Sequence, residues 1–136
     1  HYEKALATGS RKEVDKAVEI LLQVDRLLAS HPDYSLERWV EFARESACDS
    51  RSADLYEANA KRLITTWGGW QEDYAARFWA GLIRDYYIPR IQIYFSSERE
   101  KLDEWEENWI NTPYDGKEQA FEQPLEAIDL LLNSLR

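Results

Sequence analysis

This sequence contains one cysteine and no methionine. Cys48 is the only cysteine among 136 residues, so no disulfide can form within the chain. We interpret it as a small apolar residue near a helix end. Methionine is missing even at position 1, where a full open reading frame begins with it. We therefore expect an excised or processed segment of a longer protein.

Long apolar runs and a surplus of basic residues are missing too. No stretch reaches the roughly 18 consecutive apolar residues of a membrane span, and the first residues lack a basic region followed by an apolar run. The net charge is -9, with 17 Lys and Arg against 26 Asp and Glu. Nucleic acids and anionic membranes both attract clustered positive charge, so this balance disfavours them as partners.

Metal ligands are scarce as well. His1 and His31 are the only histidines, and neither has companion His, Cys or carboxylate residues at the spacing of a zinc site. We therefore expect no metal and no other cofactor.

The pattern that is present is helical. An apolar fraction of 44% is enough for a real core at this length, and the alternation of period two that marks strands is absent. No internal repeat is evident, and no linker rich in Pro, Gly or Ser divides the chain. The sequence predicts an all-α fold, a single helical bundle or array of about six helices, with residues 1–136 forming one domain.

The individual helices follow from apolar spacing and capping signals. Ser10 and Glu13 match a capping box at the start of the first helix, and Ser35 can cap the second. Pro89 is expected to break or kink the fourth helix and to start the next. The predicted helices are 11–29, from 36 onward, 53–66, from 70 onward, 91–109 and from 124 onward.

Two of these helices have features that bear on function. One side of the third helix is expected to hold Leu55, Tyr56, Asn59, Leu63, Ile64 and Trp67. Gly68 and Gly69 then end it, because glycine readily adopts the left-handed conformation of a helix end. Ala80 and Gly81 lie inside the fourth helix, where small residues indicate close approach of another helix.

A series of fragments between Tyr56 and Tyr94 carries a family resemblance. In sequence order it reads Tyr56-Glu57-x-Asn59, Ile64-Thr65-x-Trp67-Gly68, Asp73-Tyr74-Ala75, Trp79-Ala80-Gly81-Leu82 and Tyr86-Tyr87-x-Pro89-Arg90. This series resembles the C-terminal helical domain of the α-N-acetylglucosaminidases, glycoside hydrolase family 89. Five fragments in the right order are far more specific than any one of them.

The chain also departs from the family pattern at several positions. Lys61 stands where the family usually has Arg, Gly69 where Pro is usual, and Ile91 where a Trp commonly follows Pro-Arg. The loop from Gly68 to Glu72 is shorter than in better-known members. Function that depends on this loop is therefore the least transferable.

The resemblance implies a role within a larger enzyme. The parent protein would be an exo-acting glycosidase that removes terminal α-linked N-acetylglucosamine with retention. In that family both catalytic glutamates belong to a separate (β/α)₈ barrel, which no segment here matches. We therefore expect no catalytic residue in this chain and no activity from it alone. The expected partners are the catalytic barrel of the same polypeptide and the glycan, in a secreted, periplasmic or lysosome-like compartment.

Trp67 is the best candidate for sugar contact. An indole face can stack on the apolar face of a pyranose, and the resemblance places this Trp-Gly pair in one wall of the sugar pocket. Gly68 would let the chain approach a ligand closely, and Tyr74 lies near the same loop. Each also has a structural interpretation: Trp67 as the last core residue of its helix, Gly68 as a helix-ending glycine, and Tyr74 at a core edge.

Other polar and aromatic residues near the loop have mainly structural interpretations. Trp70 could form a second aromatic wall, but a hydrophobic staple at the start of the fourth helix is favoured. Asn59 and Arg90 are expected to be hydrogen-bonded residues that fix helix registry.

The alternative function is a non-catalytic helical protein-interaction module whose exposed aromatic residues receive a partner helix or domain. A free-standing enzyme using Asp73 or Glu72 lacks a positioned second acid.

Overall fold

The computed structural model describes residues 2–67 and 75–134. Their regular structure is helical, which confirms the predicted all-α array. A bridge between Ser35 and Ala80 is the only extended pairing among these residues. The α-helices are α1 (Tyr2–Thr8), α2 (Arg11–Leu28), α3 (Leu36–Glu45), α4 (Ser50–Leu63), α5 (Ile88–Tyr94), α6 (Leu102–Asn111) and α7 (Pro124–Ser134), with the helical turns η1 (Pro32–Tyr34), η2 (Ile83–Tyr87) and η3 (Arg99–Lys101) between them.

Side-chain caps start two of the longer helices. The Ser35 hydroxyl accepts a hydrogen bond from the Arg38 N–H at the start of α3, as predicted, and Asp49 caps α4 by accepting from Ser52. The capping box predicted at Ser10 is wrong, because the Ser10 side chain makes no capping bond. Its expected partner Glu13 is buried and pairs instead with Lys4 of α1, at 3.6 Å.

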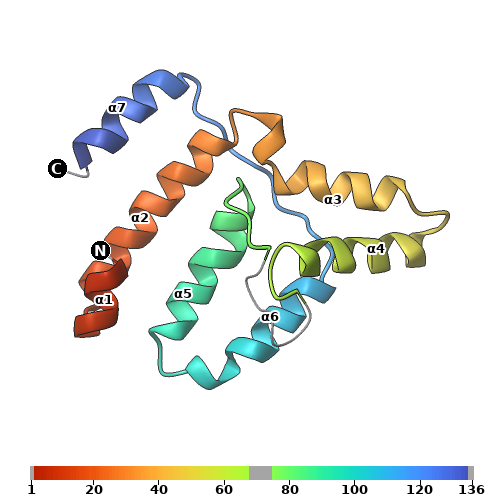
Figure 1. Ribbon diagram of the computed structural model, residues 1–136, viewed down its shortest axis with the longest axis horizontal. Helices are drawn as coiled ribbons and strands as arrows, with labels where there is room; N and C mark the ends of the chain where they lie inside the picture. The colour runs from red at the N-terminus through yellow and green to blue at the C-terminus, as the bar shows by residue number, and fades with distance from the viewer. Residues whose placement is uncertain (1, 68–74, 135–136) are drawn as a thin grey trace.

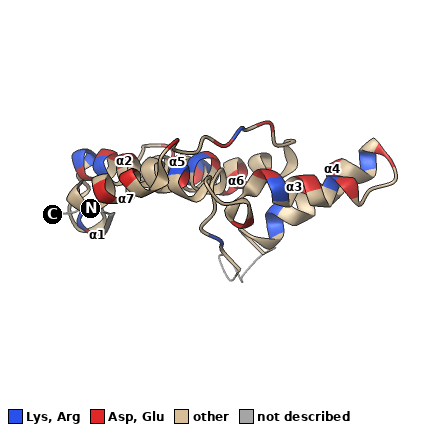
Figure 2. Cartoon of the chain, turned by 90° about the horizontal axis from the view of Figure 1, so that it is seen from above, with Lys and Arg blue, Asp and Glu red and all other residues tan. Residues whose placement is uncertain are grey.

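The helices are arranged in one broad layer (Figures 1 and 2). α3 and α4 pack side by side as a hairpin at one end, while α1 and α7 both pack on α2 at the other end, where the two chain termini lie. η2 and α5 connect the halves, since they contact α2 on one side and α6 on the other, and α6 contacts α4. Residues 75–80 project from one face of the layer, opposite the segment 112–123 (Figure 2).

The main core lies where α3, α4, η2 and α6 meet. Its buried cluster is Leu36, Val40, Ile64, Leu82 and Tyr86. The Tyr86 ring has its centroid 5.7 Å from that of Trp105 and 4.7 Å from that of Trp109. The two tryptophans of α6 are partly buried and pack against this core.

The helix predicted from residue 70 is wrong over residues 75–81 and right from Leu82 onward. Residues 75–80 are not helical, and helical structure begins at Leu82. Gly81 has a φ of 76°, a left-handed conformation that ends the preceding extended segment instead of continuing a helix. The small residue is needed because a Cβ there would lie 2.5 Å from the Tyr114 hydroxyl, so the nearest neighbour is the 112–123 segment, with Leu36 of α3 next at 3.3 Å.

The long helix predicted for 91–109 is also wrong. α5 ends at Tyr94, and a turn and η3 separate it from α6. The Ser96 hydroxyl donates to the Ile93 carbonyl and accepts from the Glu98 N–H, and such local bonds compete with helix continuation. The role expected for Pro89 is confirmed, because it lies in the first turn of α5, directly after the π-helical turn η2.

Acidic and basic side chains are interspersed along α2, α3 and α4 (Figure 2), whereas α6 and α7 carry acidic residues without basic ones. Within the described ranges, no helix combines the length and apolar character needed to cross a bilayer.

Candidate functional site

Trp67 lies just beyond the end of α4 in a left-handed backbone conformation. Its φ is 55°, and its N–H donates to the Arg62 carbonyl at 2.9 Å. A bulky side chain in this region costs about 1–3 kcal/mol, so the surroundings must impose the conformation. The side chain is 38% exposed, so Trp67 is not the last core residue of its helix. Gly68 and Tyr74, the other predicted sugar contacts, lie outside the described residues, as do Trp70 and Asp73.

Ala80, the last residue of the non-helical stretch 75–80, is anchored to the start of α3. The Ala80 N–H donates to the Tyr34 carbonyl at 2.7 Å, and the Leu36 N–H donates to the Ala80 carbonyl at 3.1 Å. Gly81 follows directly, with the left-handed φ described above. Ala80 therefore lies beside the first residues of α3.

The buried carboxylate of Asp25, on α2, holds the backbone at Gly81 and Arg84. Asp25 is 1% exposed, and one of its oxygens accepts from the Gly81 N–H at 2.8 Å and from the Arg84 N–H at 3.1 Å. Burial raises the pKa of the Asp25 carboxyl, while these two N–H groups and the Arg84 charge oppose the rise. Sequence reasoning did not single out Asp25. Its signal was an acidic residue between Leu21 and Leu28, on the apolar stripe of α2.

An open groove lies beside this anchor on α3. It has a volume of about 620 Å³ and aromatic walls formed by Trp39, Phe42 and Trp79. The Trp39 indole N–H donates to the Ala60 carbonyl at 2.9 Å, and its ring meets that of Trp79 edge-on at 5.7 Å. Trp39 is 36% exposed and Phe42 is 60% exposed.

The face of α4 that was expected to be buried is mostly exposed. Only Ile64 of its six residues is buried, and Asn59 is exposed rather than a hydrogen-bonded core residue. Several large apolar side chains of α3 and α4 are exposed, and they are here called the α3–α4 face: Trp39, Phe42, Leu55, Tyr56 and Leu63. Surfaces of this kind on a soluble domain mark sites of interaction.

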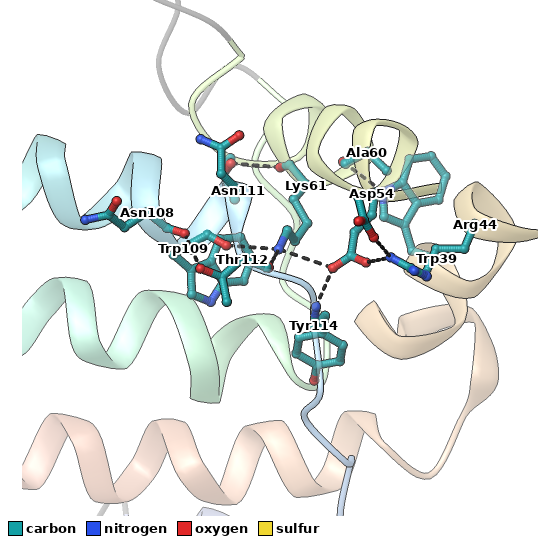
Figure 3. Close-up of polar contacts among 12 residues, drawn as sticks. Trp39, Arg44, Asp54, Ala60, Lys61, Asn108, Trp109, Asn111, Thr112 and Tyr114 are labelled. Atoms are coloured by element: carbon teal, nitrogen blue, oxygen red, sulfur yellow. Dashed lines mark hydrogen bonds and ion pairs between the residues drawn. The ribbon is translucent and has the colours of Figure 1, made fainter. Parts of the chain in front are cut away.

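The buried side of α4 instead carries an ion pair. Glu57 and Lys61 are each 1% exposed, with 3.3 Å between their charged atoms. Figure 3 shows the Lys61 ammonium pointing at the Trp109 and Thr112 carbonyls, to which it donates, while Glu57 accepts from Arg44 and from the Tyr114 N–H. Burial lowers the pKa of Lys61, and Glu57 opposes the shift. The pair fastens the end of α6 and the segment after it to α4.

Arg90 has the structural role that was predicted for it. Its guanidinium pairs with Glu106 at 2.7 Å, and the Tyr86 hydroxyl donates to the same carboxylate at 2.7 Å. Among the described residues, no group of three His, Cys, Asp or Glu side chains is arranged to hold a metal.

The fold and the site define an all-helical domain that displays a strained tryptophan and an apolar face. Residues 1–131 match the family model described as the α-N-acetylglucosaminidase (NAGLU) C-terminal domain, and the chain belongs to this family. The resemblance seen in the sequence is thereby confirmed.

Relatives show how much of a longer protein this chain represents. It is 35% identical over 107 residues to human α-N-acetylglucosaminidase, a match that covers 71% of this chain and 14% of the human protein. The family 89 glycoside hydrolase from Clostridium perfringens, in complex with PUGNAc, has a TM-score of 0.77 and 27% identity over 98% of this chain and 18% of that one. The Clostridium protein in complex with its substrate GlcNAc-α-1,4-galactose has a TM-score of 0.75, with 26% identity over 97% of this chain and 18% of that one. The chain therefore spans less than a fifth of the length of these relatives.

Proposed function

We propose that this chain is the C-terminal helical domain of a retaining exo-α-N-acetylglucosaminidase and acts as an accessory to a catalytic barrel in the same polypeptide. The barrel supplies both catalytic carboxylates, and the helical domain supplies one wall of the pocket for terminal α-linked N-acetylglucosamine. Membership of the family and the greater length of its relatives support this division of labour. The same relationship supports a secreted, periplasmic or lysosome-like compartment.

The main support for the sugar wall is the conformation of Trp67. Strained backbone persists where the fold over-determines it, and it clusters at ligand-binding sites. The half-exposed indole offers an apolar face that suits the C–H face of a pyranose. In this proposal Gly68 allows close approach of the sugar, and Tyr74 adds a polar tip on the other side of the loop.

The α3–α4 face is the surface that we assign to the barrel. Trp39, Phe42 and Leu63 are large apolar side chains that a free-standing domain gains nothing by exposing. A covalently attached domain covers such a face without the full entropy cost of association, because the linkage keeps the effective concentration high.

Kinetics of the full-length protein test the sugar wall. Trp67→Ala should raise KM for an aryl α-N-acetylglucosaminide by roughly tenfold or more, because loss of a stacking contact worth about 1.4 kcal/mol weakens binding by that factor. Trp67→Phe keeps a ring and should raise KM less. Tyr94→Ala, at the end of α5, is the control for loss of an aromatic residue elsewhere. An unchanged KM in Trp67→Ala would contradict the proposal.

The isolated chain tests the division of labour. It should show no turnover of the same glycoside, since both catalytic carboxylates of the glycosidase are supplied from outside the chain. Turnover by the chain alone would overturn that division. The exposed α3–α4 face also suits the alternative, a protein-interaction module, and this alternative gains if the full-length protein proves inactive on the glycoside.

A further inference from the structure

The segment 112–123, here called the strap, joins α6 to α7 without helical structure of its own. It passes the start of α3 and the end of α2 on its way to α7 (Figure 1). Among the described residues, 113–122 make no backbone-to-backbone hydrogen bond with one another or with the rest of the chain. Contacts of side chains therefore decide how firmly the strap is held on the layer.

The first half of the strap is held by Tyr114 and Lys117. The Tyr114 N–H donates to Glu57, its hydroxyl donates to Asp85 at 3.0 Å, and the Arg84 guanidinium donates to the Lys117 carbonyl at 2.8 Å. Burial and the Asp85 charge raise the pKa of the Tyr114 hydroxyl. The hydroxyl therefore stays protonated, and its contact with Asp85 does not depend on its own titration.

Glu118 holds the middle of the strap on the start of α3. One of its carboxylate oxygens accepts from the Ser35 hydroxyl and from the Glu37 N–H, each at 2.9 Å. The same oxygen would lie 3.3 Å from a Cβ on Gly81, so the glycine leaves room for it. Glu118 thus satisfies a free N–H of the first turn of α3 from more than eighty residues away.

The surroundings of Glu118 disfavour its charged form. Its side chain is half-buried, and burial raises the pKa of the carboxyl, while the two hydrogen bonds oppose the rise. Two further carboxylates face it and add to the rise: Glu37 on α3 and Asp25 on α2. Asp25 is held nearby because it accepts from the Gly81 N–H. Three carboxyl groups from three parts of the chain thus lie around one turn.

The cations on the neighbouring elements contact other groups. They are Arg84 of η2, which pairs with Asp85, Arg26 of α2, which lies 4.0 Å over the Phe121 ring, and Arg38 of α3, which lies over the Phe42 ring. The negative charges around Glu118 are therefore the groups that its own charge meets.

We propose that the strap closes in acid and loosens toward neutral pH, with the Glu118 carboxyl as the group that responds. Protonated Glu118 keeps an oxygen that accepts from α3 and is no longer repelled by Glu37 and Asp25. An open strap lets Glu118 reach water, where its charge is not disfavoured. The stabilisation of the closed strap is therefore complete below the ordinary Glu pKa of 4.5 and is lost as the pH rises through the raised pKa of Glu118.

Hydrogen exchange of the full-length protein tests the strap at the Glu37 amide, whose N–H is held by Glu118. Mass spectrometry with fragmentation resolves this amide, and division by the intrinsic exchange rate at each pH gives its protection factor. The protection factor should be several-fold higher at about pH 4.5 than at about pH 7. Opening of the strap frees this N–H, and each unit by which a pKa is raised changes such an equilibrium about tenfold.

Glu118→Gln keeps the accepting oxygen and removes the charge. Protection of the Glu37 amide in this variant should be equal at the two pH values and close to that of the parent protein in acid. Tyr114→Phe is the matched control, because it loses the contact with Asp85, which does not titrate through Tyr114. It should lower the protection by the same factor at both pH values.

If Glu118→Gln does not fold, Glu37→Gln takes its place. This variant removes one of the charges that face Glu118, so it should reduce the difference in protection between the two pH values. The proposal is wrong if the parent protein shows no difference, or if the variant retains the full difference of the parent. Because the measurement needs no glycoside, its outcome is independent of the function proposed above.

Discussion

Trp67 has a backbone conformation that glycine adopts without strain and tryptophan does not. At an ordinary helical position Ala is more stable than Gly by about 1 kcal/mol, whereas at a left-handed position the order reverses. The variant Trp67→Gly should therefore have a higher free energy of unfolding than Trp67→Ala, by roughly 1 kcal/mol. Urea unfolding of the two variants measures the difference, and it is independent of the indole contacts, which both variants lose. A more stable Ala variant would show that the backbone at this position is not left-handed.

Lys61 is a buried charge that holds two backbone carbonyls and one carboxylate. Lys61→Met fills similar space but leaves Glu57 and the Trp109 and Thr112 carbonyls without their donor, so it should lower the free energy of unfolding by about 3 kcal/mol. Lys61→Arg keeps the charge and several donors and should cost less. Urea unfolding followed by circular dichroism compares the two. Equal losses would mean that the shape of the lysine side chain, rather than its charge, is what the site requires.

At the scale of elements, Asp25 joins α2 to the start of η2 through a carboxyl whose pKa is raised by burial. A carboxyl with a raised pKa binds a proton more readily in the folded than in the unfolded chain. Its contribution to the free energy of unfolding therefore grows as the pH falls through the folded pKa toward about 4, the value in the unfolded chain. Arg84 faces Asp25 and favours its charged form, while Asp85 and Glu118 disfavour it.

Asp25→Asn removes this titration and keeps the hydrogen-bond acceptor. Relative to the parent chain, the variant should be more stable at about pH 7 and lose that advantage as the pH approaches about 4.5. Urea unfolding of both proteins across this range measures the effect. Glu118, whose pKa burial also raises, remains in both proteins, so a smaller stabilisation at acid pH should persist in the variant. Parallel stability curves would exclude Asp25 as the titrating group.

An element could be predicted from the sequence where local signals determine its start and its end. Ser35 and Pro124 mark helix starts through capping and a fixed φ, and both helices form where expected. The helix expected from residue 70 does not form before Leu82, where Gly81 adopts a positive φ in contact with Tyr114, a residue more than thirty positions away. Asp25 was missed for the same reason, since its partners lie on another element.

The burial of α4 shows a second limit of sequence reasoning. Periodicity identified an apolar side through Leu55, Tyr56 and Leu63, but the helix buries the neighbouring side, with Glu57 and Lys61. The helix α4 uses both sides if one packs on the core of this domain and the other packs on a second domain. An amphipathic pattern identifies an apolar face, and it does not identify the body against which that face packs.

At the scale of the whole molecule, the isolated domain and the domain within its parent protein are expected to differ at the α3–α4 face. This face is exposed in the isolated domain, and we propose that the barrel covers it in the parent protein. Phe42 is 60% exposed and makes little contact with the core, so Phe42→Glu should change the free energy of unfolding of the isolated chain by less than about 0.5 kcal/mol.

In the assembly with the barrel that we propose for the full-length protein, the same substitution places a charge in an apolar interface. Phe42→Glu should therefore destabilise the helical domain by about 2 kcal/mol or more, because burying an unpaired charge is costly. Differential scanning calorimetry should then show the helical domain melting at a lower temperature, apart from the rest of the protein. Phe42→Leu, which keeps an apolar side chain, is the control and should have a small effect in both contexts. If Phe42→Glu is neutral in both contexts, another surface of the domain meets the barrel. If it is harmful in both, Phe42 stabilises the fold of the domain itself.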